Sequence, residues 1–60
     1  MKLRALRERQ SFSLRELSEL SGVNYNAIWR LEIGRTGAQP RTIRRLAEAL
    51  GVEPTELMKG

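Results

Sequence analysis

Two polar and two aromatic residues lie close together in the segment YNAIWR, near the middle of the 60-residue sequence. Asn26 and Arg30 carry planar groups that can form paired hydrogen bonds to the edge of a nucleobase. Tyr25 and Trp29 carry ring faces for apolar contacts, and each has one polar hydrogen to donate. Each pair is spaced four residues apart, so on a helix its members are neighbours. The chemistry of this cluster is therefore recognition by hydrogen bonds and ring contacts.

The rest of the composition argues against catalysis. The chain has no histidine and no cysteine, which removes the commonest acid–base group, thiolate ligands and disulfides. Its carboxylates are scattered and form no nucleophile–base set, so we expect no enzymatic activity, no metal and no cofactor. The start, MKLRALRERQ, lacks the apolar region of a signal peptide, and no apolar run approaches the roughly 20 residues of a membrane span. We therefore expect no membrane association and a cytoplasmic location.

The charge balance leaves two interpretations open. Eleven Lys and Arg residues against seven acidic ones give a net charge of +4 and a pI of about 10.7. A strongly basic small domain is typical of nucleic-acid binding. The same balance is compatible with a merely soluble, arginine-rich surface.

Capping residues divide the chain into five predicted helices, which we expect to form a single domain over residues 1–60. The stretch SLRE at 13–16 is a capping box, in which Ser13 and Glu16 satisfy each other's backbone amides. Glycines at 22, 34 and 51 follow predicted helix ends. The predicted helices are 2–9, 14–21, 25–33, 41–50 and a short one from Pro54. The segment 35–40 is predicted to be a loop.

The spacing of apolar residues predicts which side of each helix faces the core. Unrolled at about 100° per residue, the third helix gathers Asn24, Ala27, Ile28 and Leu31 on its core side. Asn26, Arg30 and Ile33 fall opposite, with Trp29 beside them and Tyr25 on the first turn. The predicted inward positions elsewhere are Leu3, Leu6, Phe12, Leu17, Leu20, Ile43, Leu46, Ala47, Leu50, Leu57 and Met58.

Two short helices joined by a tight turn at Gly22, in a basic all-helical chain, form the arrangement called helix-turn-helix. The stretch LRELSELSGVNYNAIWRLEIG resembles the two DNA-facing helices of phage Cro and repressor DNA-binding domains, the XRE family. The stretches TIRRLAEALGV and PTELM resemble that family's fourth helix and its short closing helix. The resemblance covers nearly the whole chain. It implies an all-α fold of five helices, the lambda-repressor-like helix-turn-helix domain.

The resemblance also implies a function and residue roles. It implies a small transcriptional regulator that binds double-stranded DNA with its third helix in the major groove, located on the nucleoid. By position in the family pattern, the base-contacting residues would be Tyr25, Asn26, Trp29 and Arg30. The residues contacting the DNA backbone would be Ser13, Arg15, Asn24, Arg35 and Arg41. Arg7 and Glu32 would form a structural ion pair between the first and third helices.

Three features depart from the family pattern. Leu14 replaces a glutamine that usually contacts DNA, and Ser11 replaces a glycine at the end of the first helix. If Ser11 is left-handed, it costs about 1 kcal/mol or slightly more. The loop before Pro40 is also slightly long for the family.

Two matters stay open at the level of sequence. The same fold could serve as a protein-interaction module with an exposed patch of Tyr25, Trp29 and Ile33. Family members usually bind two half-sites as dimers, and for this chain we expect at most a weak homodimer on DNA.

Overall fold

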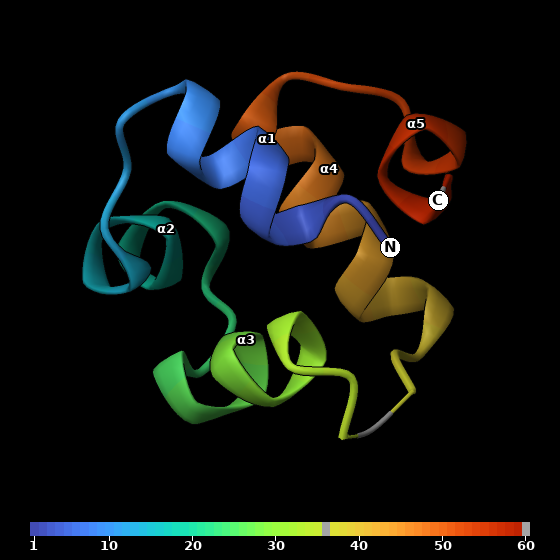
Figure 1. Ribbon diagram of the computed structural model, residues 1–60, viewed down its shortest axis with the longest axis horizontal. Coiled ribbons are helices and arrows are strands. Elements are labelled where there is room, and N and C mark those ends of the chain that lie inside the picture. Colours follow the sequence, from blue (N-terminus) through green and yellow to red (C-terminus); the bar gives the residue numbers. More distant parts are fainter. Residues whose placement is uncertain (36, 60) are drawn as a thin grey trace.

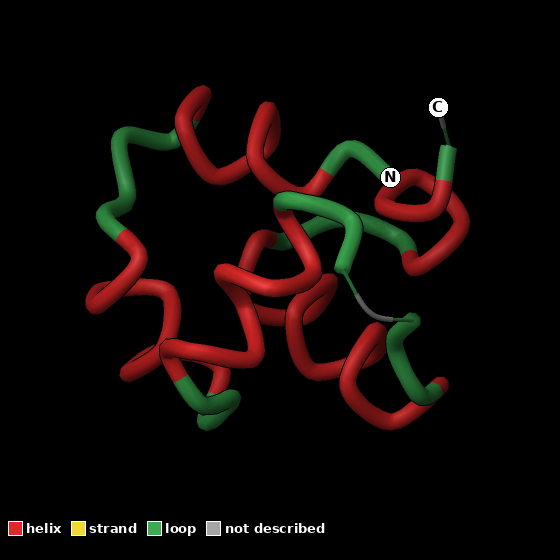
Figure 2. The backbone as a smooth tube through the Cα atoms, turned by 60° about the horizontal axis from the view of Figure 1, so that its bottom comes forward, coloured by secondary structure: helices red, strands yellow, loops and turns green. Residues whose placement is uncertain are grey.

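The computed structural model describes residues 1–35 and 37–59; Thr36, within the predicted loop, and Gly60 lie outside the described residues. Across the described ranges the chain forms helices and no strand (Figure 2). The prediction of an all-α fold with five helices is confirmed. The first four helices begin and end within one residue of their expected limits, and the fifth begins at Pro54 as expected. The helices are α1 (Leu3–Arg9), α2 (Leu14–Ser21), α3 (Tyr25–Glu32), α4 (Pro40–Leu50) and α5 (Pro54–Met58).

The first helix ends on a strained residue. Ser11 has a φ of 60°, the left-handed region that favours glycine. Its amide donates to the Glu8 carbonyl at 2.9 Å, and the Phe12 amide donates to the Arg7 carbonyl at 3.1 Å. These two bonds satisfy the last carbonyls of α1 in the manner usually built on glycine. Ser11 therefore adopts the left-handed conformation of the glycine that it replaces in the family pattern.

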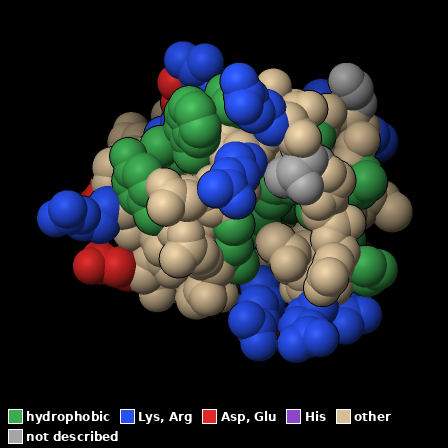
Figure 3. Space-filling view, turned by 90° about the horizontal axis from the view of Figure 1, so that it is seen from below, with side chains coloured by type: hydrophobic (Ala, Val, Ile, Leu, Met, Phe, Trp, Pro, Cys, Tyr) green, Lys and Arg blue, Asp and Glu red, His purple; other side chains and the backbone are tan. Residues whose placement is uncertain are grey.

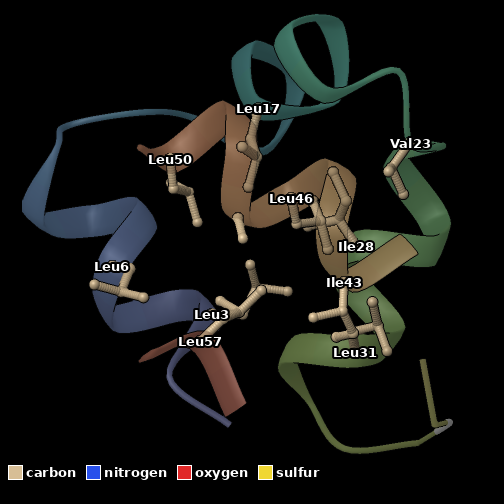
Figure 4. Close-up of a cluster of buried hydrophobic side chains, with 11 residues drawn as sticks. Leu3, Leu6, Leu17, Val23, Ile28, Leu31, Ile43, Leu46, Leu50 and Leu57 are labelled. Carbon is tan, nitrogen blue, oxygen red and sulfur yellow. The ribbon is translucent and has the colours of Figure 1, made fainter. Parts of the chain in front are cut away.

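The core takes side chains from all five helices and from the α2–α3 turn (Figure 4). Leucines from α1, α2, α4 and α5 meet Ile28 and Leu31 of α3, so the small core closes around the inner side of α3. Phe12 lies at its edge and is only partly buried. The buried hydrophobic residues are Leu3, Leu6, Leu17, Val23, Ile28, Leu31, Ile43, Leu46, Ala47, Leu50 and Leu57.

Three of the predicted inward positions are wrong. Asn24, predicted on the core side of the third helix, is exposed and caps α3. Leu20 keeps 58% of its surface exposed and Met58 keeps 55%. The inward stripe of α2 runs through Leu14, Leu17, Ser18 and Ser21, and Leu20 lies beside it. In α5, Leu57 is fully buried, and Met58, about 100° further round the helix, is left in solvent.

The helices are tied so that α3 lies along one side of the molecule, at the bottom of Figure 1. The Lys2 amide donates to the Leu57 carbonyl at 2.9 Å, which joins the start of α1 to α5. The Gln10 side chain donates to the Leu50 carbonyl at 2.6 Å, which joins the ends of α1 and α4. These hydrogen bonds hold α1, α4 and α5 together on the inner side of α3, and the outer side of α3 stays uncovered. Among the described residues, the longest helix is far too short and polar to cross a bilayer.

Candidate nucleic-acid interface

The turn between α2 and α3 fixes how the two helices meet. Gly22 ends α2 in the left-handed region, with a φ of 73°. The Ser18 hydroxyl donates to the Val23 carbonyl at 2.6 Å, and the Val23 side chain is buried. The Asn24 side-chain oxygen then accepts from the Asn26 amide at 2.8 Å, which caps α3. Every residue of this short turn is held, so the start of α3 has a defined position relative to α2.

The third helix divides into a buried and an exposed side. Ile28 and Leu31 are buried, as the helical period requires. Tyr25 and Trp29 keep 48% and 46% of their surfaces exposed, and Asn26 and Arg30 are also exposed. We call these four residues the recognition face. Within the part of the chain that the structure describes, none of the four side chains forms a hydrogen bond or salt bridge, so their polar groups remain available to a ligand.

The structure brings Arg7 of α1 and Glu32 at the end of α3 together. Arg7 Nε and Nη2 donate to the two Glu32 carboxylate oxygens at 2.6 and 3.0 Å, and Nη1 donates to the Phe12 carbonyl at 2.9 Å. The side chains are 12% and 4% exposed. The hydrogen bond to Glu32 raises the pKa of the Arg7 guanidinium, and burial opposes this only in part. This bidentate ion pair links α1 to the end of α3.

An open hollow of about 570 Å³ borders the recognition face where α2 begins. It is lined by Arg7, Ser13, Leu14, Arg15 and Tyr25. Ser13 caps α2, since its hydroxyl accepts from the Glu16 amide at 3.0 Å while its own amide donates to Glu16 at 2.8 Å. The Glu16 carboxylate offsets part of the positive helix end, and Glu32 already neutralises Arg7. Arg15 is therefore the cation that gives this hollow its attraction for an anion.

The other predicted backbone-contacting residues lie around the two ends of α3. Asn24 precedes α3, and Arg35 follows it with its amide bonded to the Arg30 carbonyl at 3.0 Å. Arg41 is the second residue of α4. All three residues are exposed. The structure thus places the predicted set around the recognition face, at the beginning of α2, at both ends of α3 and at the beginning of α4.

A second hollow, of about 210 Å³, shows two polar residues that the sequence prediction missed. Gln39 and Thr42 line it together with Arg30, Gly37 and Ala38. They lie at the start of α4, which begins at Pro40 and not at the predicted position 41. A proline is favoured at the first position of a helix. The order Gln-Pro-Arg-Thr was therefore a signal that could have placed Gln39 and Thr42 at this helix start, facing the end of α3.

The side of the molecule that carries α3 is rich in basic groups. Figure 3 views it from below and shows Lys and Arg side chains across the surface, with hydrophobic side chains among them. Asp and Glu side chains are visible only toward the left of that view. Over residues 1–35 and 37–59, no three acidic, histidine or cysteine residues gather in a way that could hold a metal ion. The surface thus combines cationic, amide and aromatic groups.

Comparison with known proteins gives two matches. The sequence profile of the helix-turn-helix domain family matches residues 1–58. The HTH-type transcriptional repressor RghR of Bacillus subtilis (strain 168) is 44% identical over 57 residues, which are 93% of this chain. The chain spans 42% of the length of that repressor. No solved structure matches the chain significantly.

Proposed function

The chain belongs to the helix-turn-helix domain family, and from this we propose that it binds double-stranded DNA sequence-specifically, as a small transcriptional regulator. Helix α3 lies in the major groove, where each base pair presents a distinct pattern of donors and acceptors. The observation that carries this proposal is the recognition face, four exposed side chains that form no hydrogen bond or salt bridge within the described residues and are bordered by arginines. The similar Bacillus protein is named a transcriptional repressor, so repression in the cytoplasm is the regulatory role we propose.

The polar members of the recognition face provide the hydrogen bonds to bases. Asn26 pairs with an adenine and Arg30 with a guanine, and each bidentate pair contributes about 1–3 kcal/mol of discrimination. Tyr25 reaches a phosphate through its hydroxyl or contacts a base. Trp29 presents its ring to the groove and has one indole donor.

The surrounding polar residues bind the DNA backbone and set the affinity. Arg15 lies at the first hollow, Arg35 follows α3 and Arg41 is the second residue of α4, so the three cations lie around α3. Ser13 and Asn24 add uncharged contacts. If each arginine neutralises one phosphate, log K falls against log salt with a slope of roughly −3. Changing Arg15 to Gln then makes the slope shallower by about 0.9, with little change in sequence preference.

The protein-interaction hypothesis, which uses the Tyr25, Trp29 and Ile33 patch, is not favoured. Both matches are to helix-turn-helix proteins, and the named relative is a transcriptional repressor. The patch is also bordered by Asn26 and Arg30, which suit a polar, anionic partner.

Selection from random DNA duplexes at low salt tests the proposal. The whole chain is incubated with the pool, and bound duplexes are recovered and sequenced over several rounds. We expect a short motif that includes an adenine and a guanine in positions reached by neighbouring turns of one helix. Recovery of no motif, or of a pool equal to the input, contradicts the proposal. The matched control is a chain carrying both Asn26→Ala and Arg30→Ala, which should bind DNA without selecting that motif.

We further propose that two copies pair weakly on DNA through the surface around Met58. This exposed methionine borders an apolar hollow of about 280 Å³, lined by Ala38, Pro40, Ile43, Arg44 and Pro54. A protruding apolar side chain beside an apolar hollow is self-complementary, as a two-fold interface requires.

The size of the domain limits this contact. One tenth of the 4190 Å² surface is roughly 400 Å² per copy, half of what a stable interface buries. The contact is therefore weak without DNA.

Binding to duplexes with one and with two half-sites tests the dimer. The Met58→Gln variant should keep its affinity for one half-site and lose the cooperativity on two. Leu20→Gln is the matched control, since Leu20 is an equally exposed apolar residue on α2. Equal cooperativity in the two variants contradicts this interface.

A further inference from the structure

Three large apolar side chains form a row along the outer side of α3. Tyr25, Trp29 and Ile33 follow one another at intervals of four residues, and Ile33 is 45% exposed, like the two aromatics. The Ile33 amide donates to the Trp29 carbonyl at 3.1 Å, so the helical spacing continues to the end of the row. We call these three residues the apolar row. At about 1.5 Å per residue it is roughly 12 Å long, the length of three to four base pairs.

The row does not belong to the core. Ile28 and Leu31, on the inner side of the same helix, are buried and fill the space between α3 and the other helices. The described chain has six exposed large hydrophobic residues, and three of them are in this row. A continuous exposed line of this kind indicates a ligand with apolar groups at similar spacing.

The surroundings of the row identify the chemistry of that ligand. Asn26 and Arg30 each follow an aromatic member by one residue, so a polar line runs beside the apolar line. The one carboxylate of α3, Glu32, is bonded to Arg7 and nearly buried. The ligand is thus anionic, offers hydrogen-bonding edges and presents small apolar groups between them. The major groove of DNA meets this description only where thymine places its 5-methyl group.

From this arrangement we infer that the apolar row, with Trp29 at its centre, selects half-sites by the 5-methyl groups of thymines. The inference rests on the proposed DNA-binding function and adds the ligand class of its apolar contacts. An adenine bonded to Asn26 is paired with a thymine, whose methyl group lies in the same groove. The row therefore reads methyl groups next to the base pairs that Asn26 and Arg30 contact. Ile33, outside the base-contacting set expected from the sequence, becomes a specificity-determining residue.

Replacement of thymine by uracil in the selected half-site tests this inference, because uracil lacks only the methyl group. Each thymine is replaced in turn, and the dissociation constant is measured by fluorescence anisotropy of labelled duplex. One buried methyl group corresponds to about a fourfold change in affinity. We therefore expect about fourfold weaker binding at one or more positions within a four-base-pair stretch, and no change at thymines outside it.

Protein variants assign the effect to residues. In Trp29→Ala, the ratio between thymine and uracil duplexes should fall to one at the position that Trp29 contacts. Ile33→Ala should do the same at a different position, which provides a second test if either variant folds poorly. Asn26→Ala is the matched control, since it should weaken binding and keep the ratio.

The outcomes separate the inference from the proposed function. A selected motif without thymines in the stretch, or uracil duplexes bound as tightly as thymine duplexes, overturns the inference and leaves sequence-specific DNA binding intact. A thymine-to-uracil ratio that survives in both Trp29→Ala and Ile33→Ala also overturns it. Failure of the selection to return any motif contradicts the proposed function and the inference together.

Discussion

The two sides of α3 use their polar groups in opposite ways. On the α1 side, Arg7 makes three hydrogen bonds to Glu32 and Phe12, and both charged side chains are nearly buried. On the recognition face, Asn26 and Arg30 make no side-chain bond within the described chain and are exposed. One side has its hydrogen-bonding capacity satisfied internally, and the other keeps it for a ligand. Stability and recognition should therefore be separable by substitution within one eight-residue helix.

The largest expected effect is on stability, from breaking the ion pair. Glu32→Gln leaves the Arg7 charge buried without its counter-charge, which costs about 3 kcal/mol. A 60-residue domain has only about 3–9 kcal/mol in total, so the variant should be partly unfolded at 25 °C. Urea denaturation followed by circular dichroism measures the loss. Glu8→Gln is the control, since its exposed pair with Arg4 at 3.3 Å contributes under about 1 kcal/mol. If Glu32→Gln loses as little unfolding free energy as Glu8→Gln, the buried ion pair does not stabilise the fold more than the exposed pair does.

The ion pair also shows what the sequence could predict. The limits of the helices follow from local signals, such as the Ser13–Glu16 capping box and the glycine after each helix, and these lie within a few residues of their partners. The Arg7–Glu32 pair joins positions 25 apart and was accessible only through resemblance to a family. The bond from Gln10 to the Leu50 carbonyl spans 40 positions and left no signal in the sequence.

Exposure at the ends of short helices was predicted less well. The apolar spacing of α3 and α4 correctly separated their inner from their outer apolar residues. Leu20 fitted the same spacing, but the inward stripe of α2 is made by Leu14, Leu17, Ser18 and Ser21, and in α5 the buried position belongs to Leu57 and not to Met58. The recognition face could be named from the sequence, although the two hollows beside it depend on how α2 and α4 approach α3.

The next effect in size is on DNA binding, from the recognition face. Arg30→Ala removes one bidentate contact and should cost about 1–3 kcal/mol of discrimination at one base pair. Non-specific binding and the unfolding free energy should stay nearly unchanged, because Arg30 has no side-chain bond in the described structure. A repeated selection with the variant, together with its urea midpoint, measures both properties. If Arg30→Ala loses as much stability as Glu32→Gln, the two sides of α3 are not independent.

A smaller effect is expected at the strained residue beside the ion pair. Ser11, at a φ of 60°, precedes Phe12, whose carbonyl accepts from Arg7. Ser11→Gly removes the left-handed penalty, and the gain is offset in part by the greater freedom of glycine when unfolded. We expect a net gain of up to about 1 kcal/mol, or about 4–8 °C in Tm for a domain of this size. Ser11→Ala, which keeps the strain, should show no gain, and DNA affinity should be the same in both variants.

The smallest expected effect is that of pH, and it bears on both sides of α3. The pKa of Arg7 is raised by Glu32, so its contribution to stability is fully present below the usual arginine value and is lost only as the pH rises through the higher folded value. That range is strongly alkaline, and the chain has no histidine or cysteine to titrate nearer neutrality. Unfolding free energy and DNA affinity should both stay nearly constant between about pH 6 and pH 9. A step in affinity without a step in stability within that range would contradict this expectation.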